Sequence, residues 1–140
     1  MSVEDFLDTN VFIYLFDETD PRKRRRAESL VHRSLEDGSG CISFQVVQET
    51  LNVVTRKLGA RPQSARLLLD DVLAPLWLVN PTRTLYARGL GVHAHFGFSY
   101  YDSLIVAAAL EAGCTRLYSE DLQHGQQVEH LTIQNPFVTS

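Results

Sequence analysis

The chain has 140 residues, of which 44% are hydrophobic and 21% are charged, and its formal net charge is −4. This length suits one domain over residues 1–140; no apolar run approaches the ~20 residues that span a bilayer, and the acidic start MSVEDFLDTN is unlike a signal peptide. We therefore expect a cytoplasmic protein without membrane association, and the acidic balance argues against a uniformly basic surface that binds nucleic acid.

Short strands and helices alternate along the whole chain. Asp20 before Pro21 illustrates the signals used, because aspartate caps the free N–H groups of a helix and proline fits its first turn. The expected elements are a strand over 3–7, a short helix over 10–16, a helix over 21–37, a strand over 41–44, helices over 44–58 and 62–73, a strand over 76–79, helices over 83–93 and 100–112, and strands over 116–119 and 131–137. This alternation predicts an α/β domain with a mainly parallel sheet of about five strands and helices on both faces.

Acidic residues are expected to gather at one edge of this sheet. In an open parallel sheet, ligand sites lie just beyond the carboxyl ends of the strands. Asp8 follows the first strand, and Glu49 lies early in the helix that leaves the second. Asp121 follows the strand over 116–119, and Asp102 begins the helix that leads into that strand. Each acid alone is ordinary as a helix cap, turn or solvated residue, but four at one edge predict a site.

Carboxylates gathered in this way repel one another. Two of them about 4 Å apart cost roughly 1 to 4 kcal/mol, so four ionised acids require protons or a bound cation. Oxygen ligands without cysteine or an obligatory histidine favour Mg²⁺ or Mn²⁺. Such ions polarise a phosphodiester and lower the pKa of an attacking water. The pattern therefore predicts metal-dependent hydrolysis of a nucleic-acid backbone.

Four segments, in order, carry a family resemblance. They are FLDTNVFIYLFD, SFQVVQETLNVVTRK, SYYDSLIVAAALEAGCTRLYSEDLQHGQ and IQNPF. Together they resemble the PIN-domain nucleases, and particularly the VapC-like toxins of bacterial type II toxin–antitoxin pairs. The resemblance implies a PIN-like three-layer α/β/α fold and endoribonuclease activity, in which a metal-activated water attacks the RNA phosphodiester. It also implies a cognate antitoxin protein as partner and a homodimer.

The same resemblance assigns roles to individual residues. The acidic quartet, defined as Asp8, Glu49, Asp102 and Asp121, would be the catalytic set that coordinates Mg²⁺ or Mn²⁺. Asn10 and Ser119 would support the first and last acids by hydrogen bonding. Glu120, beside the last acid, leaves the identity of the fourth ligand open.

Basic residues form one dense cluster, RKRRR, at the start of the helix over 21–37. A solvated helix face is the ordinary interpretation of such a cluster. The alternative is contact with RNA phosphates or with an acidic partner, because clustered arginines bind phosphate well. The possible substrate contacts are Arg22, Arg24, Arg25, Arg56 and His124.

Other functions remain open at this point. A haloacid-dehalogenase-like phosphatase would need a second acid two residues after the first, where this chain has Asn10. A receiver domain would need a lysine near the last strand, and no lysine follows Lys57. A catalytically inert PIN-like module that binds RNA or protein is the non-enzymatic alternative, although unused acids at close quarters would only destabilise it.

Overall fold

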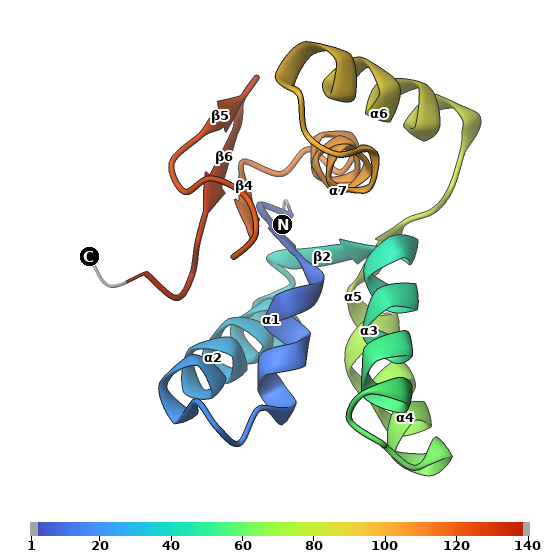
Figure 1. The fold of residues 1–140 in the computed structure, drawn as a ribbon, viewed down its shortest axis with the longest axis vertical. Helices are drawn as coiled ribbons and strands as arrows, with labels where there is room; N and C mark the ends of the chain where they lie inside the picture. Colours follow the sequence, from blue (N-terminus) through green and yellow to red (C-terminus); the bar gives the residue numbers. More distant parts are fainter. Residues whose placement is uncertain (1–2, 139–140) are drawn as a thin grey trace.

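A six-stranded sheet runs through the computed structural model, which describes residues 3–138 (Figure 1). Its strands are β1 (Asp5–Leu7), β2 (Gly40–Ser43), β3 (Trp77–Val79), β4 (Arg116–Tyr118), β5 (Gln127–Val128) and β6 (Leu131–Gln134). The strand order is β3-β2-β1-β4-β6-β5, and every neighbouring pair is parallel except β5 and β6. The predicted α/β fold with a mainly parallel sheet is confirmed.

Helices pack against this sheet. They are α1 (Thr9–Ile13), the 3₁₀ turn η1 (Tyr14–Phe16), α2 (Pro21–Asp37), α3 (Phe44–Arg56), α4 (Pro62–Leu68), the π-helical turn η2 (Leu69–Leu73), α5 (Ala74–Leu76), α6 (Arg83–Phe96) and α7 (Tyr100–Glu111). In Figure 1, α6 and α7 pack together on one side of the sheet, whereas α1 and α2 lie on the other. In the part of the chain that the structure describes, we find no helix that is long and apolar enough to cross a bilayer.

Helix α7 lies at the centre of the packing. Every residue from Ser103 to Leu110 is buried, as a helix without a polar face requires. Helix α6 approaches it closely at Gly89, where an added Cβ would lie 2.8 Å from a terminal carbon of Leu104. Because α7 leads into β4 and parallel strands share one carboxyl edge, the start of α7 lies at that edge.

The helix predicted over 62–73 continues to Leu76 instead of stopping before the third strand. Proline lacks a backbone donor, and its ring clashes with the carbonyl four residues earlier in an α-helix. The wider π-helical turn Leu69–Leu73 directly precedes Pro75 and accommodates it. Strand β3 therefore begins at Trp77.

The last strand is shorter than predicted, and it pairs with a strand that the pattern did not reveal. Strand β6 ends at Gln134 because the chain turns there, and the side-chain oxygen of Asn135 accepts the backbone N–H of Phe137 at 2.9 Å. The two-residue strand Gln127–Val128 pairs with β6 as a hairpin. Two residues are too few to show a period along the sequence.

Candidate functional site

Asp8 is the buried acid around which the site is built. Its backbone N–H donates to the carbonyl of Tyr118, which fixes the end of β1 against β4. The side chain is only 6% exposed, and it caps α1. Its Oδ1 accepts the backbone N–H of Thr9 at 2.7 Å, and its Oδ2 accepts the hydroxyl of Ser119 at 2.7 Å. Both carboxylate oxygens are therefore held in place from two different elements.

The environment of Asp8 disfavours its charge. Burial raises the pKa of Asp8 from 3.8 to about 6, against the opposing effect of its two hydrogen bonds. The negative charges of Glu49 and Asp121 raise this pKa further. Among residues 3–138, no lysine, arginine or histidine forms an ion pair with Asp8. A bound cation would supply the missing counter-charge.

Asp5, three residues earlier in β1, shows the opposite arrangement. It is as deeply buried as Asp8. Its Oδ1 lies 2.8 Å from Nε of Arg116, and its Oδ2 lies 3.7 Å from a terminal nitrogen of Arg33. The chain therefore neutralises the buried acid Asp5 with arginines, whereas the charges that act on Asp8 are those of other acids. This contrast separates a structural carboxylate from a candidate ligand.

Glu49 and Asp121 are the two acids whose charges raise the pKa of Asp8. Glu49 is exposed on α3, and its Oε2 lies 3.4 Å from the hydroxyl of Thr9, which donates to it. Asp121 is exposed in the loop that follows β4. Thr9 thus contacts two acids of the quartet, one through its backbone and one through its side chain. Sequence analysis did not identify Thr9, and the only available signal was a hydroxyl residue directly after the first acid.

Asp102 lies on the adjoining helix. It is half-buried in the first turn of α7, where its backbone N–H donates to the side-chain oxygen of Ser99 at 3.2 Å. The side-chain nitrogen of Gln45, in the first turn of α3, donates to the carbonyl of Tyr101 at 3.1 Å. This bond ties the start of α7 to the helix that carries Glu49. Within the described chain, no hydrogen bond or ion pair joins the Asp102 carboxylate to the other three acids.

The donor set suits a hard divalent ion, but the acids do not form a closed cage. Among residues 3–138, no group of three or more His, Cys, Asp or Glu side chains has the arrangement of a metal site. Glu49 and Asp121 are exposed whereas Asp8 is buried, so the described acids are not enclosed together. The fit rests on the oxygen-only chemistry and on the uncompensated burial of Asp8.

The predicted supporting residues differ in their placement. Ser119 does hydrogen-bond to an acid, but to the first acid of the quartet rather than the last. Both polar atoms of the Asn10 side chain are buried, and neither has a hydrogen-bond partner within the described residues. The expected bond from Asn10 to Asp8 is therefore absent. The backbone N–H of Thr9 takes that place.

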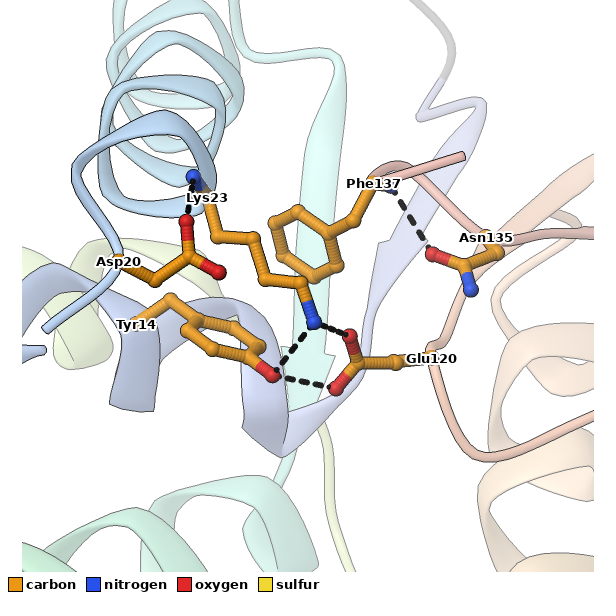
Figure 2. Close-up of polar contacts among 6 residues, drawn as sticks. All are labelled: Tyr14, Asp20, Lys23, Glu120, Asn135 and Phe137. Carbon is orange, nitrogen blue, oxygen red and sulfur yellow. Dashed lines mark hydrogen bonds and ion pairs between the residues drawn. The ribbon is translucent and has the colours of Figure 1, made fainter. Parts of the chain in front are cut away.

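The carboxylate of Glu120 is engaged by Tyr14 and Lys23 (Figure 2). The Tyr14 hydroxyl donates to its Oε1 at 2.6 Å, and the Lys23 ammonium donates to its Oε2 at 2.5 Å. Lys23 also lies 4.8 Å from the centre of the Tyr14 ring and 5.6 Å from that of Phe137. The hydrogen bonds to Glu120 and Tyr14 raise the pKa of Lys23. Since Glu120 is engaged there, Asp121 is the acid of this pair that acts on Asp8.

The predicted substrate contacts do not all lie in one place. Arg24 is paired with Glu28 at 3.5 Å along α2, and Arg25 is exposed on the same helix. Arg56 is exposed in the last turn of α3. Arg22 and His124, from distant parts of the sequence, line one hollow.

Comparisons with known proteins find a matching family and similar folds. The PIN domain family model matches residues 6–127. Ribonuclease VapC23 of Mycobacterium tuberculosis is 32% identical over 117 residues, which cover 83% of this chain and 91% of that protein. A toxin–antitoxin complex from Klebsiella pneumoniae superposes with a TM-score of 0.69 at 17% identity, over 95% of this chain and 98% of that one. M. tuberculosis VapC20, a Sarcin-Ricin loop cleaving toxin, superposes with a TM-score of 0.64 at 21% identity, over 84% of this chain and 90% of that one.

Proposed function

This chain belongs to the PIN domain family, and we propose that it is a Mg²⁺- or Mn²⁺-dependent endoribonuclease, the toxin of a toxin–antitoxin pair. The family and the PIN-like fold expected from the sequence motifs are confirmed. One observation carries the catalytic part of the proposal. Asp8 is a buried acid whose charged neighbours are other acids, at the carboxyl edge of a parallel sheet.

The acidic quartet would hold the ion, with Asp8 as its fixed member. When bound, the ion would polarise the scissile phosphodiester and lower the pKa of the attacking water. Ser119 and the backbone of Thr9 orient the two oxygens of Asp8, each of which keeps a lone pair for a further contact. Glu49 and Asp121, whose charges act on Asp8, would supply further carboxylate oxygens.

The solved toxin–antitoxin complex of similar fold supports a cognate antitoxin as the protein partner. A homodimer belongs to the same proposal. An antitoxin and a second copy of the chain would each need an interface that excludes water. Exposed apolar side chains that stand alone do not identify such an interface. Several large ones are present on the described surface, among them Phe16, Leu58, Leu67, Trp77, Leu78 and Leu90.

The direct test is cleavage of an end-labelled RNA by the purified chain. We expect internal cuts in the presence of Mg²⁺ or Mn²⁺ and no cuts in EDTA, while single-stranded DNA of the same sequence remains intact. Internal cuts separate an endonuclease from a phosphatase, which would remove only a terminal phosphate. Cleavage at the same rate in EDTA would contradict the role of the ion. No cleavage under any metal condition would favour an inert binding module.

A further inference from the structure

A hollow of about 670 Å³ lies between the start of α2 and the segment that follows β6. Its polar lining comes from Arg22, Arg26, His124, Gln134 and Asn135. None of the residues that line it is acidic. In a chain with a net charge of −4, this is a locally positive concave surface.

Two guanidinium groups of the hollow, those of Arg22 and Arg26, have no acidic partner in the part of the chain that the structure describes. Lys23 and Arg24, between them in the sequence, are paired with Glu120 and Glu28. Within residues 3–138, neither Arg22 nor Arg26 forms an ion pair. Arg26 is positioned by a bond from its Nε to the carbonyl of Pro136 at 3.1 Å. Its terminal nitrogens and the whole guanidinium of Arg22 remain as donors.

The neutral side chains of the hollow also offer donors. The Nδ1 atom of His124 accepts the backbone N–H of Asn135 at 2.9 Å, so a neutral imidazole carries its proton on Nε2. The Oδ1 atom of Asn135 accepts the N–H of Phe137, which leaves its NH₂ group for other contacts (Figure 2). Two guanidinium groups, an imidazole N–H and an amide NH₂ form a donor set suited to a phosphate.

The hollow is close to the acidic site along the chain. The loop after β4 supplies Ser119 to Asp8 and then Asp121, and His124 follows three residues later. Three residues span at most about 11 Å. An RNA strand cut at the acids would therefore have a neighbouring phosphate within reach of the hollow.

We propose that this hollow binds a backbone phosphate of the RNA substrate, a short distance along the strand from the bond that is cut. The proposal rests on the proposed ribonuclease function for the identity of the ligand. The hollow supplies attraction at a place where the acidic quartet repels RNA. The basic residues at the start of α2 then have separate roles. Arg22 contacts phosphate, whereas Lys23 and Arg24 form structural ion pairs.

The test is binding of a fluorescent single-stranded RNA in EDTA, measured by anisotropy over a range of salt concentrations. Arg22→Gln should weaken binding roughly tenfold at low salt and reduce the slope of log K against log salt by about 0.7 to 1, as expected for one lost phosphate contact. Arg22→Lys should retain most of the slope because it keeps the charge. The matched control is Arg25→Gln, which removes the same charge from an exposed position outside the hollow. It should change affinity less than twofold.

Equal effects of Arg22→Gln and Arg25→Gln would overturn the proposal, since general charge would then explain both. So would unchanged RNA binding by Arg22→Gln, including the case in which that variant instead loses the antitoxin. The two proposals fail separately. Binding of RNA that depends on Arg22 in a wild type that never cuts RNA would refute the nuclease and keep the phosphate site. Normal cleavage and normal RNA binding by Arg22→Gln would refute the phosphate site and leave the proposed nuclease intact.

Discussion

Asp8→Asn is expected to reduce metal-dependent RNA cleavage at least about a thousandfold, which corresponds to roughly 4 kcal/mol of transition-state stabilisation. The substitution keeps the size of the side chain and can still accept the N–H of Thr9 through its remaining oxygen. It removes the negative charge and replaces one oxygen ligand with an NH₂ group that cannot bind a cation. The fold should be retained, because no lysine, arginine or histidine among residues 3–138 forms an ion pair with this carboxylate.

The rate is measured as initial cleavage of a labelled RNA with saturating Mg²⁺. Asp5→Asn is a matched control, since it makes the same chemical change in a buried acid three residues earlier in the chain. It should retain the wild-type rate per folded molecule, because Asp5 is paired with Arg116 and lies outside the quartet. A rate for Asp8→Asn within tenfold of the wild type would exclude Asp8 as a ligand of the catalytic ion.

The same two variants should change metal-free stability in opposite directions. An aspartate has a pKa near 3.9 in the unfolded chain, whereas folding raises that of Asp8 to about 6. Below pH 4 the group is protonated in both states and contributes nothing. Above pH 6 it is ionised in both, and the folded state is disfavoured by about 3 kcal/mol. Asp8→Asn should therefore become progressively more stable than the wild type between pH 4 and pH 6.

Asp5→Asn should lower the free energy of unfolding by about 2 kcal/mol at neutral pH, because it removes the charged hydrogen-bond partner of Arg116 and the ion-pair partner of Arg33. Both effects are measured by denaturant unfolding in EDTA from pH 4 to pH 7.5. A destabilised Asp8→Asn at neutral pH would show that the native carboxylate is compensated by interactions not seen around it.

Much of the fold could be predicted from local patterns. The apolar stretch from Leu104 to Leu110 predicts a helix covered on all sides, and the structure buries every residue of it. The acids at strand ends could be placed at one edge because parallel strands have a common direction. That rule located Asp8, Glu49 and Asp121, whose charges do interact in the structure.

The remaining features depend on contacts between distant residues. Nothing local distinguishes Glu120 from Asp121, and only the positions of Tyr14 and Lys23 show which acid is engaged elsewhere. In the same way, Ser119 supports Asp8 because β4 and β1 are neighbours in the sheet. The family resemblance implied that Ser119 supports the last acid of the quartet, whereas it hydrogen-bonds to the first.

Calorimetric titration of Mn²⁺ into the wild type and into Asp8→Asn tests most directly whether the acidic quartet is a cation site. We expect saturable binding by the wild type, with protons released near pH 6 as Asp8 ionises, and affinity at least tenfold weaker in the variant. Superimposable titration curves for the two proteins, or no binding by either, would contradict the presence of a divalent ion at Asp8.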